Sequence, residues 1–209
     1  MTTPAAPIAW IDPFTLARNA IRDFDRSQRS KPMYTLDTSR LRIRPLEPAD
    51  CASIGGFLNR ELDFDFYSGP LPDEKDAAAR FDWARSLTHW EETGGLFGDH
   101  AVVLQAEDRA IGFCGADPWI WKPSLKRRAT ELFAGDPGGA EVSTIEFEIG
   151  WAILPQYRKN GYAAEAAAAM AMYLFEEQQV FRLLARTDVD NHGSRGVMRS
   201  IGMRLVEAE

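Results

Sequence analysis

Residues Arg158–Glu177 read "RKNGYAAEAAAAMAMYLFEE", with two basic residues, an asparagine and a glycine directly before a segment made largely of alanine. This segment is expected to be a helix, and the first turn of a helix exposes backbone N–H groups that have no partner inside it. Aligned peptide dipoles add partial positive charge at that end, and glycine lets a ligand come close to the backbone. The stretch therefore fits an anion site at a helix start. The alternative interpretation is a basic loop that leads into a buried helix.

The composition bounds the class of protein. The chain has 209 residues, of which 45% are hydrophobic and 26% are charged, as in folded globular domains. It shows neither a secretory signal pattern nor an apolar run of the about 20 residues that cross a membrane. These features predict a cytoplasmic protein without a membrane partner. A net charge of -7 disfavours general nucleic-acid binding, because such binding needs a basic face to neutralise phosphates.

Several common catalytic motifs are missing from the sequence. There is no GxxxxGK[ST] or GxGxxG pattern, which disfavours nucleotide hydrolysis and dinucleotide binding. The histidines form no HExxH motif, and no GxSxG marks a nucleophile elbow. Cys51 and Cys114 lack the paired spacing of zinc sites and disulfide frameworks, so we expect core thiols and no metal site.

The predicted elements follow one another in a mixed α/β order. We expect an N-terminal appendage over residues 1–33, with a short amphipathic helix after Asp12, and one domain over residues 34–209. Residue alternation and the positions of proline and glycine predict the elements of that domain. These are strands at 41–44, 100–107, 110–118, 145–155, 181–189 and from 203, helices at about 48–60 and 73–93, the alanine-rich helix, a short helix at 191–202, and a long connection at 119–144.

The opening stretch also fits a family pattern, [QR]xxGx[GA], at Arg158, Lys159, Asn160, Gly161, Tyr162 and Ala163. This pattern is the acyl-CoA pyrophosphate turn of the GNAT superfamily of N-acetyltransferases. Three stretches around it are similar to the branch of the ribosomal-protein N-terminal acetyltransferases RimJ and RimL: "TSRLRIRPLEPAD", "EIGWAILPQYRKNGYAAEA" and "RTDVDNHGSRGVMRSIGM". The resemblance covers about residues 38–209.

The resemblance implies a fold and a function. The fold is the GNAT acyl-CoA N-acyltransferase fold, a mostly antiparallel central sheet that is splayed at its fourth and fifth strands and flanked by helices. The function is acetyl transfer from acetyl-CoA to a primary amine, by direct attack in a ternary complex, with no metal. The acceptor is a small amine or a protein N-terminus, which suits a negatively charged protein. A non-catalytic acyl-CoA-binding or protein-interaction module on the same fold is the alternative.

The resemblance also implies cofactor-binding residues. Backbone amides of Arg158–Ala163 would hold the pyrophosphate of coenzyme A. The pantetheine arm would pair with backbone groups of Trp151, Ala152, Ile153 and Leu154, where one N–H could polarise the thioester carbonyl. Asn191 and Ser194 match the family's Asn-x-x-Ser, which faces the pantetheine and the departing thiol. The alternative for Asn191 is a plain helix cap.

An acetyl acceptor must lose a proton before its amine can attack, so a base is needed. Strand alternation places Glu146 and Glu148 on one face of the predicted strand. Glu148 aligns with the glutamate of the branch's "EIGY" pattern and is the first candidate for the base or the amine-binding group, and Glu146 is the second. The alternative is that both carboxylates simply face solvent on a half-exposed strand.

The sequence departs from the family in three places. Met198 stands where some members have a tyrosine acid, which leaves Ser194 to support the thiolate by a hydrogen bond. Lys159 stands where glycine is common, which either adds charge for the phosphates or distorts the turn. The chain ends at Glu209, without the strand that usually follows. Either the chain is truncated, or that strand comes from the N-terminal appendage or from a partner chain, as in a homodimer.

The acceptor is expected between an aromatic loop and the long connection. The loop carries Phe64, Phe66 and Tyr67, and the connection region carries Asp117, Trp119 and Trp121. The alternative is that these aromatic rings are buried in the core, as large rings usually are.

Overall fold

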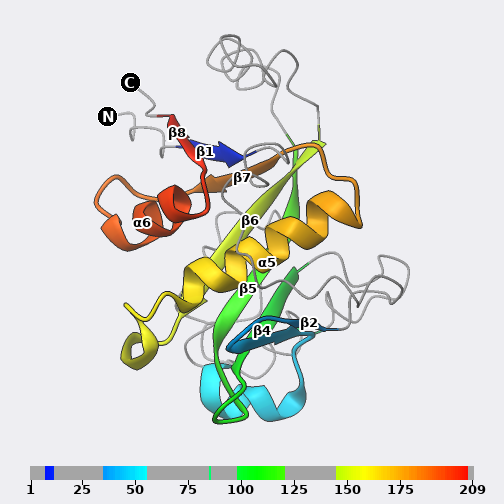
Figure 1. Ribbon diagram of the computed structural model, residues 1–209, viewed down its shortest axis with the longest axis vertical. Coiled ribbons are helices and arrows are strands. Elements are labelled where there is room, and N and C mark those ends of the chain that lie inside the picture. The colour runs from blue at the N-terminus through cyan, green and yellow to red at the C-terminus, as the bar shows by residue number, and fades with distance from the viewer. Residues whose placement is uncertain (1–7, 12–34, 56–84, 86–97, 121–144, 207–209) are drawn as a thin grey trace, which may run out of the picture. The chain divides into compact units, whose positions relative to one another are not determined.

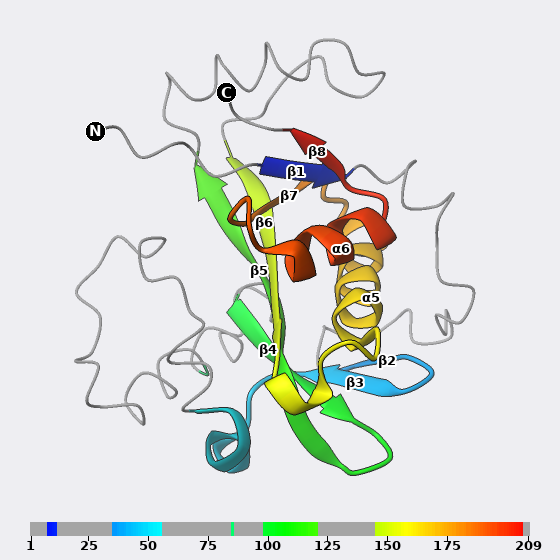
Figure 2. The same ribbon diagram turned by 90° about the vertical axis from the view of Figure 1, so that its left-hand side faces the viewer.

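The structure is a computed structural model that describes residues 8–11, 35–55, 85, 98–120 and 145–206 (Figures 1 and 2). The chain divides into two compact units, each treated by itself. Unit 1 comprises residues 1–20, 117–149 and 171–209, and unit 2 comprises residues 21–116 and 150–170.

Unit 2 is built on strands β2 (Leu36–Asp37), β3 (Leu41–Arg44), β4 (Gly98–Leu104), β5 (Arg109–Ile120) and β6 (Ile145–Ile153), the last two of which continue into unit 1. They follow this order in the sheet, and β2–β3, β3–β4 and β4–β5 are antiparallel. Leu41 and Ile43 are buried and alternate with exposed Arg42, which is the period that predicted β3. The predicted strand at 41–44 and the predicted hairpin that follows are therefore confirmed.

Strands β5 and β6 approach closely in unit 2 because of a glycine. A Cβ at Gly112 would lie 2.2 Å from the carbonyl oxygen of Ala152, so no other residue fits there without a shift. The backbone N–H of Leu154 donates to the carbonyl of Ile111 at 2.8 Å, just after β6 ends. This contact fixes the end of β6 that precedes the glycine turn.

The core of unit 2 is built on side chains of the β4–β5 hairpin and of the segments packed against it. It consists of Leu46, Ile54, Ala101, Val103, Ala110, Phe113 and Leu154, with Cys51, Ala152 and Tyr157 packed against it. The helix predicted at about 48–60 is a 3-10 turn at Pro48–Asp50 followed by a π-helical turn at Cys51–Gly55, and the rest lies outside the described residues. Cys114 is fully buried, and this burial raises the pKa of its thiol.

Unit 1 holds β7 (Leu183–Arg186), β1 (Ile8–Ile11), β8 (Arg204–Val206) and the first part of β6. The strand order is β6-β7-β1-β8. Strands β6 and β7 are parallel, with Phe147 opposite Leu183 and Glu148 opposite Leu184. No pair between described residues follows Glu148, although both strands continue. The predicted mixed sheet, mostly antiparallel, is confirmed, whereas its predicted splay stays a prediction.

Strand β1 lies between β7 and β8 and is antiparallel to both (Figures 1 and 2). This strand comes from the first part of the chain, which was one of the expected sources of an additional strand. Trp10 of β1 is buried, and its ring lies 5.5 Å from the guanidinium of Arg182 and 5.1 Å from that of Arg204. The division of the chain at residue 33 stays a prediction, and the helix predicted after Asp12 lies outside the described residues.

The two long described helices are α5 (Tyr162–Glu176) and α6 (His192–Ser200), and both predicted helices are confirmed. The alanines of α5 are buried from Ala166 to Ala169, as expected of a helix that packs closely. Within the described part of the chain, no helix is long and apolar enough to cross a membrane. The helix predicted at 73–93, the aromatic loop, and residues 121–144 with Trp121 lie outside the described residues, apart from helical Arg85.

One boundary in the prediction is wrong, because β5 runs through Pro118 to Ile120. Trp119 therefore belongs to a strand and not to the long connection. Proline was expected to end the strand because it has no N–H to donate. The pairing of β5 with β4 ends at Ala116 opposite Gly98, so Pro118 lies beyond it and costs no hydrogen bond with β4.

Candidate active site

The glycine turn adopts an unusual backbone in unit 2. A 3-10 turn at Pro155–Tyr157 is followed by Lys159 at φ 65°, Asn160, and Gly161 at φ 81°. Both angles lie in the left-handed region, which glycine enters freely and other residues enter at a cost of about 1 kcal/mol. The departure from glycine at Lys159 thus leaves the turn conformation in place and adds an exposed positive side chain.

A row of backbone donors is open at this turn. The first recorded bond of helix α5 runs from the N–H of Glu165 to the carbonyl of Gly161, at 3.0 Å. The backbone N–H groups of residues 159–164 donate to no described residue. Successive amides of this kind, next to left-handed residues and at a positive helix end, form an anion-binding concavity.

Two side chains of the turn donate hydrogen bonds to nearby backbone carbonyls. Arg158 donates through Nε to the carbonyl of Ile153 at 2.8 Å. Asn160 donates through Nδ2 to the carbonyls of Tyr157 at 3.1 Å and Arg158 at 3.2 Å. These contacts hold the turn on the end of β6, so both residues support the backbone amides.

Sequence analysis missed a cluster that holds the start of α5. The Oε1 atom of Glu165 accepts hydrogen bonds from Thr38 Oγ1 at 2.6 Å, Ser39 Oγ at 3.3 Å and the Arg40 N–H at 3.1 Å. Its Oε2 atom pairs with Nε and Nη2 of Arg40, at 2.7 and 2.6 Å. Burial alone would raise the pKa of Glu165, but the hydrogen bonds from Thr38 and Arg40 outweigh it and lower that pKa. The one signal was the "TSR" that opens a family-like stretch.

The predicted pantetheine segment lies at the end of β6. Trp151 and Ala152 are half-buried, whereas Ile153 and Leu154 are buried. Just before them, a Cβ at Gly150 would meet no described atom within 4 Å. The described structure therefore leaves space beside Gly150, whereas the backbone N–H of Leu154, just after the strand, is already bonded to β5.

The two candidate glutamates lie in unit 1, each against an arginine. Glu148 accepts two hydrogen bonds from Arg186, from Nε at 2.9 Å and Nη2 at 3.2 Å. Glu146 lies 3.8 Å from Arg182, and its side chain is only 3% exposed, against 13% for Glu148. The alternative of two solvent-facing carboxylates is wrong, because β7 pairs in parallel with β6 and sets Arg186, and Arg182 just before the strand, beside them. The difference in burial favours Glu148 over Glu146 for contact with an acceptor.

Asn191 and Ser194 meet at the start of α6, also in unit 1. Asn191 caps the helix, since its Oδ1 accepts the backbone N–H of Ser194 at 3.0 Å. The hydroxyl of Ser194 makes no hydrogen bond with the described residues, so it stays available to a ligand. Met198 is buried and apolar, so it offers no acid in place of the family's tyrosine.

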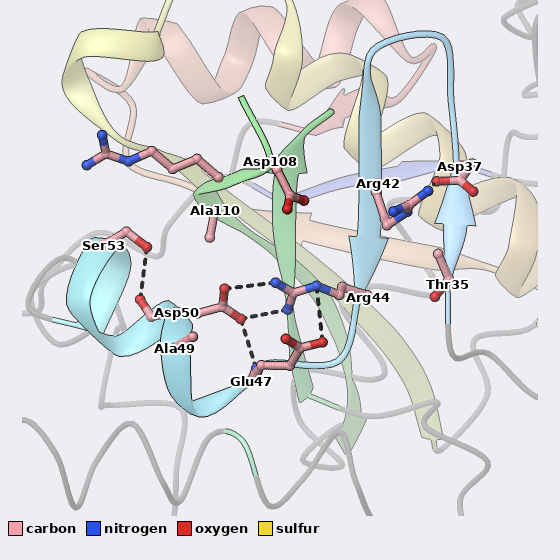
Figure 3. A pocket seen from close by; sticks show the side chains of 11 residues that line it. Thr35, Asp37, Arg42, Arg44, Glu47, Ala49, Asp50, Ser53, Asp108 and Ala110 are labelled. Carbon is pink, nitrogen blue, oxygen red and sulfur yellow. Dashed lines mark hydrogen bonds and ion pairs between the residues drawn. The ribbon is translucent and has the colours of Figure 1, made fainter. Parts of the chain in front are cut away.

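A polar cavity of about 670 Å³ lies elsewhere in unit 2 and is lined by none of the predicted site residues (Figure 3). In its wall, Arg44 donates to both carboxylate oxygens of Asp50, at 2.7 and 2.9 Å. This bond raises the pKa of Arg44, and Glu47 lies 3.5 Å away on the other side. Arg42 and Arg44 of the lining are thus already paired, with Asp37 and with Glu47 and Asp50. Among the described residues, no group of three or more His, Cys, Asp and Glu could hold a metal ion.

Similarity to known proteins agrees with this geometry. The uncharacterised N-acetyltransferase YnaD of Bacillus subtilis (strain 168) is 45% identical over 58 residues, which cover 28% of this chain and 34% of YnaD. The uncharacterised protein YkkB of the same organism is 29% identical over 169 residues, 80% of this chain and 84% of YkkB.

A solved structure shares the fold. It is the ribosomal-protein-S5-alanine acetyltransferase of Vibrio fischeri, with a TM-score of 0.54 and 15% identity over 80% of this chain and 81% of that one. The expected likeness to ribosomal-protein acetyltransferases is thus confirmed at the level of the fold. The family model described as "Acetyltransferase (GNAT) domain" matches residues 40–204, and the chain therefore belongs to the GNAT acetyltransferase family.

Proposed function

We propose that this acetyltransferase uses acetyl-CoA and transfers the acetyl group to a primary amine by direct attack in a ternary complex. The observation that carries the proposal is the turn at Lys159–Ala163, whose backbone N–H groups are open to a ligand. Acetyl-CoA supplies an activated thioester and a pyrophosphate, and the open amides fit that pyrophosphate. Backbone groups of Trp151–Leu154 would take the pantetheine arm.

The side chains have separate roles in this proposal. Glu148 receives the proton of the acceptor ammonium, directly or through a water, or holds that ammonium in place. Arg186 fixes the orientation of this carboxylate by its two hydrogen bonds. The free hydroxyl of Ser194 supports the departing thiolate. Because the amine attacks directly, no covalent enzyme intermediate is needed.

The acceptor class is a protein N-terminus or a small amine. The name of the Vibrio fischeri protein gives an alanine of ribosomal protein S5 as its acceptor, and an acceptor on a protein belongs to the first kind. A net charge of -7 favours a cationic partner, although only weakly at cellular salt.

Calorimetric titration with acetyl-CoA tests the cofactor part of the proposal. We expect micromolar binding by the native chain and none by Gly161→Glu, whose carboxylate would repel the phosphates and block the amides. Gly196→Glu is the matched control, since its Cβ would meet no described atom within 4 Å. Failure of the native chain to bind would refute the proposal.

Steady-state turnover tests the chemical part, with a panel of peptides and small amines. We expect Glu148→Gln to lower kcat by roughly a hundredfold or more while acetyl-CoA still binds. The double variant Glu148→Gln with Arg186→Gln removes both partners and should remain inactive. Recovery of turnover in the double variant would mean that Glu148 only balances the charge of Arg186. Binding without transfer to any acceptor would instead favour the non-catalytic module.

A further inference from the structure

We propose that Arg40 is a positioning residue for the acyl-CoA turn: it holds the peptide between Asn160 and Gly161 so that its N–H faces the pyrophosphate. This inference rests on the proposed function, because it assumes that the turn binds coenzyme A. It assigns a role to a residue that lies far from the turn in sequence and touches it in four ways.

The guanidinium of Arg40 spans the turn and the first turn of α5. Nη1 donates to the carbonyl of Asn160 at 3.0 Å, and Nε and Nη2 engage Glu165. The guanidinium carbon lies 4.6 Å from the centroid of the Tyr162 ring. A Cβ at Gly161 would lie 3.5 Å from Nη2, so the guanidinium packs along the glycine.

The bond to Asn160 decides where an amide points. The peptide is trans, so the carbonyl of Asn160 and the N–H of Gly161 point in opposite directions. With the carbonyl turned toward Arg40, the N–H must face away from Arg40 and toward the open side of the turn. A flipped peptide would present a carbonyl oxygen to the phosphates in place of a donor.

Helix α5 cannot hold this peptide by itself. It does hold the next one, because the carbonyl of Gly161 accepts the N–H of Glu165. The carbonyl of Asn160, in contrast, accepts from no helix amide among the described residues, and Arg40 takes the place of that missing donor. An outside group is needed to fix this peptide because Gly161 has no side chain and offers little resistance to rotation of the peptide.

The second contact of Arg40 removes a competing charge. Glu165 lies in the first turn of α5, at the helix end that would receive the pyrophosphate. An unpaired carboxylate there would interact favourably with the helix dipole, but it would repel the phosphates. Arg40 neutralises it, and the lowered pKa of Glu165 keeps the pair charged at neutral pH.

The experiment compares coenzyme A affinity in three variants by calorimetry. Arg40→Gln removes the contacts, Arg40→Lys keeps the charge, and Arg42→Gln is the control. Arg42 is on the same strand, is 47% exposed against 45% for Arg40, and pairs with Asp37 away from the turn. We expect Arg40→Gln to weaken binding roughly ten- to a hundredfold, as loss of a charge-assisted hydrogen bond implies. Arg42→Gln should stay within about twofold, since an exposed pair contributes little.

Arg40→Lys separates position from charge. Lysine lacks the planar fork that reaches Asn160 and Glu165 together, so we expect its affinity to stay well below the native value. The Km for acetyl-CoA should rise in this variant while kcat is unchanged. The NMR signal of the Gly161 amide should shift on addition of coenzyme A in the native chain and much less in the variant. If Arg40→Gln does not fold, Arg40→Lys carries the test.

The outcomes are distinguishable. Equal affinities for Arg40→Gln and Arg42→Gln, or native affinity in Arg40→Lys, would overturn the role of Arg40 and leave the proposed function standing. No binding of coenzyme A by the native chain would overturn both.

Discussion

Helices α5 and α6 start in opposite ways. Helix α6 is closed by its own chain, because Asn191 accepts the N–H of Ser194. Helix α5 starts at Tyr162, directly after Gly161, which has no side chain to cap the helix, and Glu165 of its first turn is bonded to Thr38 and Arg40. A helix start can receive an anion only where its backbone amides have no other partner, and among the described residues the start of α5 meets this condition better than the start of α6.

The largest effect is expected from the addition of one methyl group just before helix α5, where the backbone amides are uncapped. Gly161→Ala puts a Cβ on a residue with φ 81°, and the nearest described atom to that Cβ would be Nη2 of Arg40, at an ordinary contact distance of 3.5 Å. We expect the variant to lose about 1–2 kcal/mol of stability from the left-handed backbone alone. Coenzyme A should also bind less tightly. Urea unfolding and calorimetry measure both, and native stability would show that the backbone relaxes freely.

The next largest effect is expected from removal of the side-chain cap at the start of helix α6. Asn191→Ala removes the cap of α6, and we expect a loss of about 1 kcal/mol. Asn191→Asp keeps an acceptor and should stay near native stability. Thermal unfolding of the two variants compares them. If turnover falls in Asn191→Asp although stability is kept, Asn191 has a role beyond the cap.

Acid should weaken the cluster at α5. The folded pKa of Glu165 is lowered, so its ion pair stabilises the fold above the unfolded pKa of about 4.3 and loses that effect as pH falls through the folded value. We expect the difference in Tm between the native chain and Glu165→Gln to be largest near neutral pH and to shrink in acid. Thermal unfolding at several pH values measures it. A difference that is constant with pH would contradict this account.

The smallest effect concerns Lys159. Lys159→Gly relieves the left-handed backbone, and we expect a gain of up to about 1 kcal/mol, reduced by the greater freedom of glycine in the unfolded chain. Loss of the positive side chain should weaken coenzyme A binding slightly at low salt. Unchanged affinity at low ionic strength would show that Lys159 does not meet the phosphates.

Local patterns predicted most of the described elements. The alternation in "LRIR" predicted strand β3, and the alanine-rich segment after Gly161 predicted helix α5. Strand β1 was missed because "IAWI" has no alternation of its own, and its place is set by β7 and β8. Trp119 was misplaced because the cost of Pro118 depends on where β4 begins, at Gly98 opposite Ala116.

In the candidate site, too, local patterns could be read from the sequence, whereas contacts between distant segments could not. The turn is a short local motif, and its residues are close in sequence. The contacts of Glu165 with Thr38 and Arg40, and of Glu148 with Arg186, join segments that no spacing rule connects. Their partners become visible only in the folded chain.

The pairing of β1 has a consequence for the order of folding. Ile8 lies opposite Arg186 on one side and Val206 on the other, so the earliest described strand needs the last two before it can pair. During synthesis on the ribosome, this part of unit 1 cannot close until nearly all of the described chain has emerged. Contacts of such long sequence separation form slowly. Until then, both edges of β1 stay open to chaperones and to the same strand of another nascent chain.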